Sequence, residues 1–286
     1  MRKTLFVLTS VVLLLISVNI YAQTEEDYII KGNEKFDSED YKGAILDYTK
    51  AIEINPNSTS AYVMRGNCYY NISDYENAVL DYSKALEINP SHLKALFARA
   101  NCYRILKKYE DAINDYTTIV EMDPENYDAL GFRGISYYSI QKYQEALSDL
   151  NNSLEFNGDN FRFIWYRGKT KLKLGDTVNA LTDITKSIEM NPKNSYAYFD
   201  RAGIFIDKAE WEKALTDLNT AINLNSKDAS YYYNRGYTYE NLGKLEEALK
   251  DYETALNMNS SYESRLKDKI EELKTKLTEN KEDAKN

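Results

Sequence analysis

The stretch that decides the fold is residues 59–92, TSAYVMRGNCYYNISDYENAVLDYSKALEINPSH. Its first half puts three residues at the i, i+4 and i+7 spacing of one helical face: Tyr62, Gly66 and Tyr69. Its second half repeats that spacing with Ala78, Tyr82 and Ala85. Between them the run 71–74, NISD, offers turn and capping residues, and Pro90 disfavours helix in the residue before it. The stretch therefore predicts two helices joined by a short turn, packed closely where small residues meet a large tyrosine.

The same pattern recurs every 34 residues. The four prolines share one register, at Pro56, Pro90, Pro124 and Pro192. Alanine recurs at Ala44, Ala78, Ala112, Ala146, Ala180, Ala214 and Ala248. Seven units tile the chain without an insertion, at 25–58, 59–92, 93–126, 127–160, 161–194, 195–228 and 229–262. Such a series predicts a stack of helix pairs in which each unit buries its apolar face against its neighbours.

This pattern resembles the tetratricopeptide family, whose unit sets an aromatic or Leu, then Gly, Tyr, Ala, an aromatic, Ala and Pro. The resemblance implies an all-α fold, a right-handed superhelical solenoid of seven helix–turn–helix repeats. Residues 263–286 are expected to add a capping helix and a frayed tail, because one apolar stripe runs through Leu266, Ile270, Leu273 and Leu277. The fifth unit departs from the pattern at Lys171 and Thr177, so we expect it to be the loosest.

The composition argues against several classes of function. A formal net charge of -9 disfavours nucleic acid or an anionic membrane surface as the main partner. His92 is the single histidine and is expected to be solvated in a connector, which leaves little basis for a metal cluster or a histidine-based relay. There is no glycine-rich phosphate loop. We therefore expect no catalytic residues, no metal and no cofactor, and interpret the chain as not an enzyme.

The N-terminus has the features of a targeting segment. Arg2 and Lys3 precede an apolar run over 5–18, which is short for a membrane span but typical of a signal peptide. Ala22 before Gln23 is a plausible cleavage point. Residues 1–22 thus predict an exported protein, periplasmic or secreted, with no membrane insertion after cleavage. The alternative is a chain anchored in a membrane by its uncleaved N-terminus.

Two further periodic series carry charge. Arginine recurs at Arg65, Arg99, Arg133, Arg167, Arg201 and Arg235, with Lys31 and Lys269 at the same position in the first unit and the cap. Aspartate recurs at Asp47, Asp81, Asp115, Asp149, Asp183, Asp217 and Asp251. In antiparallel helices the two positions come within about two residues of the same height. They predict a structural ladder of ion pairs, whereas a repeated anion site would need the arginines to point into the groove.

Cys68 and Cys102 occupy equivalent positions in adjacent units. In an exported protein a disulfide is one interpretation. Equivalent positions on packed helices lie about 8–10 Å apart, however, and a disulfide needs Cα atoms within about 7 Å. We therefore expect two buried free thiols.

The tetratricopeptide resemblance implies a concave groove lined by the first helix of each unit, through its second, fifth, ninth, twelfth and thirteenth residues. The ninth position gives Asn33, Asn67 and Asn101, and the fifth gives Phe97, Trp165, Phe199 and Tyr233. Cations at these positions are Lys94, Arg104, Arg162, Lys169 and Lys173. Only Asn33 and Lys94 match the clamp with which chaperone-binding members hold a terminal carboxylate, so that clamp is not expected.

These groove residues favour a scaffold that binds a protein or peptide segment of acidic character. The alternative is a structural protein that associates with itself through its end repeats, and the oligomeric state is left open. Trp165 is interpreted either as a groove residue or as core, with equal weight. Trp211 stands where the family places an aromatic at the start of a second helix, so it is expected to be buried.

Overall fold

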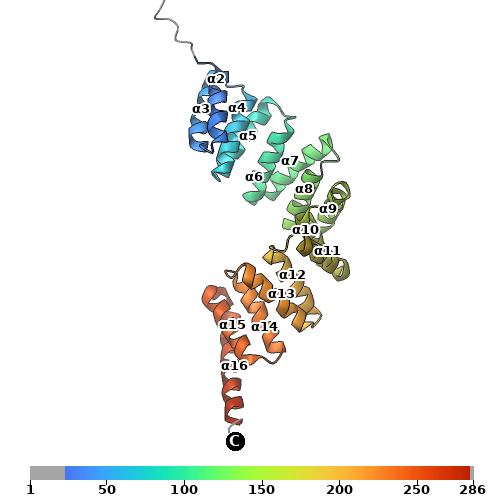
Figure 1. The fold of residues 1–286 in the computed structure, drawn as a ribbon. Helices are drawn as coiled ribbons and strands as arrows, with labels where there is room; N and C mark the ends of the chain where they lie inside the picture. The colour runs from blue at the N-terminus through green and yellow to red at the C-terminus, as the bar shows by residue number, and fades with distance from the viewer. Residues whose placement is uncertain (1–22, 284–286) are drawn as a thin grey trace, which may run out of the picture. The chain divides into compact units, whose positions relative to one another are not determined.

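The computed structural model describes residues 23–283, and this part of the chain is all-α (Figure 1). The first helices of the repeats are α2 (Glu25–Asp37), α4 (Thr59–Asn71), α6 (Leu93–Ile105), α8 (Tyr127–Ser139), α10 (Phe161–Lys173), α12 (Ser195–Asp207) and α14 (Ala229–Asn241). The second helices are α3 (Tyr41–Ile54), α5 (Tyr75–Ile88), α7 (Tyr109–Met122), α9 (Tyr143–Phe156), α11 (Thr177–Met190), α13 (Trp211–Leu224) and α15 (Leu245–Met258). The short 3-10 turn η1 (Ser260–Tyr262) leads into α16 (Glu263–Asp283). The predicted fold of successive helix pairs is confirmed.

The chain forms two compact units, one ending at Pro124 and the other beginning at Glu125. The first unit contains α2 to α7 and the second contains α8 to α16. In both units, each first helix packs most extensively on the second helix of its own repeat, and each second helix packs on the next first helix of the same unit. Consecutive packing of this kind is the arrangement expected of a repeat solenoid.

The turn inside each repeat has one conformation throughout. The second residue before the second helix lies in the left-handed region in all seven repeats, at Glu39, Ser73, Lys107, Gln141, Gly175, Ala209 and Gly243. This conformation is the usual way to end a helix, and glycine adopts it without steric cost. Only two repeats use glycine there, so tertiary packing holds the other five turns in place.

The core consists of the small residues and the tyrosines that the repeat pattern singled out. Ala44, Ala78 and their equivalents are fully buried, and so are the tyrosines that face the glycines of the first helices. A Cβ added at Gly66 would lie 2.8 Å from a ring carbon of Tyr82. A side chain at Gly66 would force this ring to shift, because the ring packs directly against the helix backbone.

The last helix covers the end of the second unit. Leu266, Ile270 and Leu273 of α16 share one buried cluster with Tyr252 and Ala255 of α15. This packing is the cap that the apolar stripe predicted. No helix among residues 23–283 is both long and apolar enough to span a bilayer. The expected signal peptide, residues 1–22, lies outside the described residues, as do the last three residues of the tail.

Candidate functional site

The arginines of the predicted ladder lie between helices and are engaged by protein groups. Arg65 donates from Nε and Nη2 to the two carboxylate oxygens of Asp81, at 2.8 and 2.7 Å, and this two-point pair recurs in the second to seventh repeats. The third nitrogen, Nη1, donates to Thr49 of the preceding repeat at 2.9 Å. All seven aspartates of the series are buried. The structural interpretation of the ladder is therefore confirmed for these six pairs.

The ladder does not extend to the lysines at its two ends, which corrects the sequence prediction. Lys31 lies over the ring of Tyr28, and Asp47 pairs instead with Lys35 at 2.5 Å. Lys269 pairs with Glu240 at 2.5 Å and with no aspartate of the series. A lysine cannot make the planar two-point contact that arginine makes with a carboxylate. These two lysines therefore contact other neighbouring groups and not the aspartate of the series.

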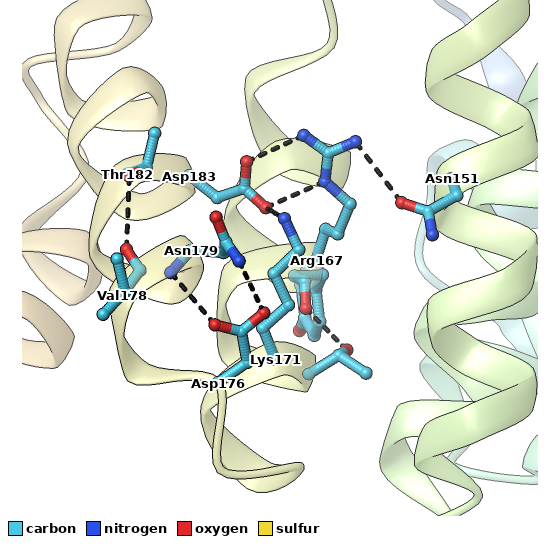
Figure 2. A network of polar contacts seen from close by, with 10 residues as sticks. Asn151, Arg167, Lys171, Asp176, Val178, Asn179, Thr182 and Asp183 are labelled. Carbon is cyan, nitrogen blue, oxygen red and sulfur yellow. Dashed lines mark hydrogen bonds and ion pairs between the residues drawn. The ribbon is translucent and has the colours of Figure 1, made fainter.

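In the fifth repeat the aspartate has two cations (Figure 2). Arg167 makes the usual two-point contact with Asp183 and reaches Asn151 of the preceding repeat. Lys171, which replaces the family tyrosine, donates to the same carboxylate at 2.6 Å. The departure from the repeat pattern thus adds an ion pair at this position.

The asparagine row has a structural role inside the first unit. The amide oxygens of Asn33, Asn67 and Asn101 accept hydrogen bonds from Tyr48, Tyr82 and Tyr116, at 2.7, 2.8 and 3.0 Å. These tyrosines are otherwise buried, and a buried hydroxyl needs such a partner. The NH2 groups of Asn67 and Asn101 also bond within their own helices. The sequence predicts these asparagines to be groove residues that bind a ligand. In the structure their amide groups form hydrogen bonds within the protein.

The other predicted residues of the first unit are Lys94, Phe97 and Arg104 of α6. Lys94 is exposed. The ring of Phe97 packs edge-on against Tyr116, with centroids 5.7 Å apart. Arg104 donates to Asn101 at 3.4 Å. Of these three predicted residues, Lys94 is the exposed cation, and Phe97 and Arg104 contact other side chains of the unit.

The second unit contains a denser cluster, centred on Lys169 of α10. Its Nζ lies 4.7 Å from the ring centroid of Trp165, 5.3 Å from that of Tyr138 and 5.4 Å from that of Tyr166. The carboxylate of Asp200 on α12 lies 3.9 Å from the same nitrogen. We call these three rings and this carboxylate the Lys169 cage. It joins side chains from α8, α10 and α12.

Asp200 was not among the residues predicted from the sequence. It accepts a hydrogen bond from Trp165 Nε1 at 2.8 Å. Burial raises the pKa of Asp200, while Lys169 and the indole N–H act in the opposite direction. Asp200 is the only acid at the sixth position of any first helix, where the other repeats have Ile30, Met64, Ala98, Phe132, Tyr166 and Asn234. That lone acid in an otherwise uncharged series was the signal that could have found it.

Beside the cage, a recess of about 340 Å³ opens between α10 and α12. Trp165 and Tyr196 line it with stacked rings 6.2 Å apart, and Arg162 and Lys193 add exposed cations. Trp165 also packs against the core cluster of Ile184 and Ile188. The two alternatives for Trp165 therefore both hold in part, since one side of the ring is core and another borders the recess.

Comparisons with known proteins identify the repeat. Tetratricopeptide repeat patterns match residues 97–160, 202–243 and 229–262, and the pattern described as anaphase-promoting complex, cyclosome, subunit 3 matches residues 37–119. These repeats belong to the tetratricopeptide repeat family. No curated protein matches the sequence.

Several solved structures share the tetratricopeptide fold of this chain. A tetratricopeptide repeat protein from Parabacteroides merdae is 24% identical, with a TM-score of 0.66, over 87% of this chain and 96% of that one. PilF of Pseudomonas aeruginosa is 19% identical, with a TM-score of 0.63, over 71% and 92%. MamA of Desulfovibrio magneticus is 16% identical, with a TM-score of 0.56, over 59% and 96%. At these identities the likeness shows the fold alone.

The remaining predicted residues lie in the sixth and seventh tetratricopeptide repeats and at the end of α10. Phe199 packs on Tyr231 with ring centroids 5.0 Å apart, and Tyr233 stacks on Tyr262 at 5.0 Å. Both rings are thus engaged in packing between elements. Lys173 is exposed at the end of α10. Trp211 is half-buried rather than buried, because its ring meets Tyr237 edge-on and also borders a shallow apolar recess.

The candidates for covalent and metal chemistry also have plain structural roles. Cys68 and Cys102 are free and buried, as predicted, and burial raises the pKa of each thiol to about 12. His92 lies in the connector before α6, as expected, but it is half-buried rather than solvated, and its Nδ1 caps α6 by accepting from the Ala95 amide at 3.1 Å. Within residues 23–283 no three His, Cys, Asp or Glu side chains gather where a metal ion could be held.

Proposed function

We propose that this chain is an extracytoplasmic scaffold that binds a polypeptide segment across the first helices of its repeats. Tetratricopeptide repeats typically form non-catalytic scaffolds for protein interaction, and the proposal assigns no reaction to this chain. The extracytoplasmic location is supported by the signal-like sequence of residues 1–22.

The observation that carries the proposal is the recess between α10 and α12. The recess is lined by the exposed side chain of Tyr196, by one side of the Trp165 ring and by the guanidinium group of Arg162. Tyrosine, tryptophan and arginine are the residue types most enriched at protein interfaces. Arg162 and Lys193 line it as exposed cations, which favours a segment with acidic residues. The asparagine row supports the proposal less, because its amides already serve the buried tyrosines.

The test is a screen of short peptides, acidic and neutral, against the chain from Gln23 onward, followed by calorimetric titration of the best binder. Tyr196→Ala should weaken binding at least about tenfold, as expected when an aromatic interface anchor is removed. Tyr196 is a sharper probe than Trp165, because it is 51% exposed and lies outside the buried core.

The matched control is Phe156→Ala, which removes an aromatic ring that is 48% exposed at the end of a second helix. It should leave both affinity and melting temperature nearly unchanged. Equal affinity for Tyr196→Ala and the parent would show that the recess is not the binding surface.

A second candidate is self-association. It is favoured by Leu46 and Leu80, equivalent residues of neighbouring repeats that are 65% and 63% exposed on the second helices. Association would require these leucines to contribute to one contiguous apolar patch, the kind of surface that marks a protein interaction site. Light scattering over a concentration series separates the two candidates, because self-association raises the mass above that of one chain without any peptide. Leu46→Lys should then restore the mass of one chain.

A further inference from the structure

The Lys169 cage has the chemistry of a site for organic cations. Three aromatic rings face one ammonium group at 4.7 to 5.4 Å, within the roughly 6 Å over which a ring attracts a cation. Asp200 adds a full negative charge at 3.9 Å and is itself held by the indole N–H. Aromatic rings joined by a carboxylate are the usual means by which proteins recognise alkylated ammonium groups.

The occupant of the cage in this chain is a side chain of the protein itself. Lys169 projects from the ninth position of α10, where the second repeat has Asn67 and the sixth has Gly203. Its side chain is 24% exposed, and that of Asp200 is 22% exposed, so the cage is open to solvent on one side. Exchange of one ammonium for another would leave the charge of the cage unchanged, and Asp200 would keep a cation.

We propose that the Lys169 cage binds an alkylammonium group of the partner, and that Lys169 fills the site as an internal stand-in until the partner arrives. This inference rests on the proposed function, because it names the chemical group that the bound segment places beside the recess. The ammonium group of Lys169 is attached to the cage through its own side chain, so it is present at an effective concentration in the millimolar range, typical of short tethers. A ligand has to compete with that concentration. Only a ligand with better cage contacts, or with further contacts nearby, would displace Lys169.

The cations around the cage define the rest of the ligand. Arg162 and Lys173 are exposed on the same helix, and Lys193 lines the neighbouring recess. They would repel a bare cation but attract an anion beside it. The ligand that fits is therefore zwitterionic, an alkylammonium flanked by a carboxylate, such as a lysine next to acidic residues in an extended peptide.

The test uses small probes, so that its result does not depend on finding the peptide. Trp211→Phe leaves Trp165 as the only tryptophan and therefore as the fluorescent reporter of the cage. In that background, Lys169→Ala empties the cage, and Lys186→Ala, at an exposed lysine of α11, is the control. Each protein is titrated with glycine betaine and with 3,3-dimethylbutanoate, which has the same shape and carboxylate but no ammonium charge.

The expected result is saturable quenching by glycine betaine in Lys169→Ala, with at least tenfold tighter binding than in the parent or in Lys186→Ala. 3,3-Dimethylbutanoate should give no saturable change. A folded Lys169→Ala variant that binds neither probe, or both equally, would overturn the proposal and leave Lys169 as a structural contact between repeats.

If Lys169→Ala does not fold, the parent protein decides the question. Glycine betaine at high concentration should then produce a saturable signal that Asp200→Asn weakens at least tenfold, and the absence of such a signal would overturn the cage. The proposed function fails separately, when Tyr196→Ala binds peptide as well as the parent does, because that titration involves no free ammonium probe.

Discussion

At the scale of single residues, the hydroxyl groups of buried tyrosines explain the asparagine row, which the sequence predicts to be part of a binding groove. Asparagine stands at the ninth position of the first helix in the three repeats whose second helix carries Tyr48, Tyr82 or Tyr116. Where Leu150, Ile184 or Leu218 replaces the tyrosine, the asparagine is absent as well. In the last repeat the hydroxyl of Tyr252 bonds to Glu240 instead. The asparagines therefore follow the need of the buried tyrosines for an acceptor.

Buried serines give a matched pair for the same principle. The hydroxyl of Ser153 donates to the Tyr127 carbonyl at 2.7 Å, whereas the equivalent hydroxyl of Ser187 is buried without a partner. We expect Ser187→Ala to raise the free energy of unfolding by about 1 kcal/mol, because it removes an unsatisfied polar group. Ser153→Ala should lower it by a similar amount. Chemical denaturation of the two variants checks this, and equal effects of the same sign would contradict it.

The two thiols give a prediction about reactivity. Only the thiolate is nucleophilic, and burial raises the pKa of Cys68 and Cys102 to about 12. At pH 8 both cysteines should resist alkylation in the native protein and react fully once it is unfolded. Mass spectrometry after iodoacetamide treatment measures this directly. Recovery of a peptide that links the two cysteines, from a digest without reductant, would show the free-thiol assignment to be wrong.

At the scale of helices, the Arg–Asp pairs join the two helices of the second to seventh repeats, and Arg65 and Arg99 also reach the preceding repeat. We expect Arg133→Ala to lower the free energy of unfolding by about 1–3 kcal/mol, because Asp149 would remain buried without its cation. Arg167→Ala should lower the free energy of unfolding by less than half as much, because Asp183 would keep its ion pair with Lys171. Urea denaturation of both variants checks this comparison.

The pH dependence adds a control for Arg133→Ala. Burial already raises the pKa of Asp149 in the native protein, and Arg133 opposes that shift. Without the arginine the folded pKa rises further above its unfolded value, so the ionised form is the costly one. The deficit of the variant should therefore be largest at neutral pH and shrink as the pH falls and Asp149 becomes protonated. A deficit that is constant with pH, or equal for Arg133→Ala and Arg167→Ala, would argue against the uncompensated carboxylate.

The helices themselves could be predicted from the sequence, whereas the contacts between repeats could not. The spacing of Gly66 and Tyr82 is local and periodic, so it indicated both the helix pair and its close packing. The Lys169 cage depends on how three first helices bring Tyr138, Trp165 and Asp200 together. No sequence pattern within a single repeat specifies these contacts between side chains of different repeats. Sequence therefore found Trp165 and Lys169 as candidates but missed the acid that holds them.

At the scale of the whole molecule, the sequence of residues 1–22 leads to a prediction about export. We expect the exported protein to begin at Gln23, because the basic start and the apolar run over 5–18 are typical of a cleaved signal peptide. Intact-mass measurement of protein recovered outside the cytoplasm checks this, with a Lys→Gln substitution at Lys3 as a mild control that should leave the cleavage site unchanged. Retention of Met1 on the exported protein would favour the anchored alternative.

The cap determines whether the end of the array stays folded. Leu273 of α16 is fully buried in the cluster that covers Tyr252 and Ala255, and leucine-to-alanine changes in such sites typically cost about 2–5 kcal/mol. In a repeat protein each element depends mainly on its neighbours. Leu273→Ala should therefore loosen the end of the array first, rather than lower the stability of the chain uniformly.

Hydrogen exchange followed by mass spectrometry measures that locality. In Leu273→Ala, peptides from α14, α15 and α16 should lose protection by at least tenfold, while peptides from α2 to α7 should exchange as in the parent. Lys267→Ala, an exposed position on the same helix, should change neither set. An equal loss of protection in α2 to α7 would mean that the chain unfolds as one cooperative body, which nearest-neighbour packing does not allow. A local loss would instead show that α16 stabilises the repeat that it covers.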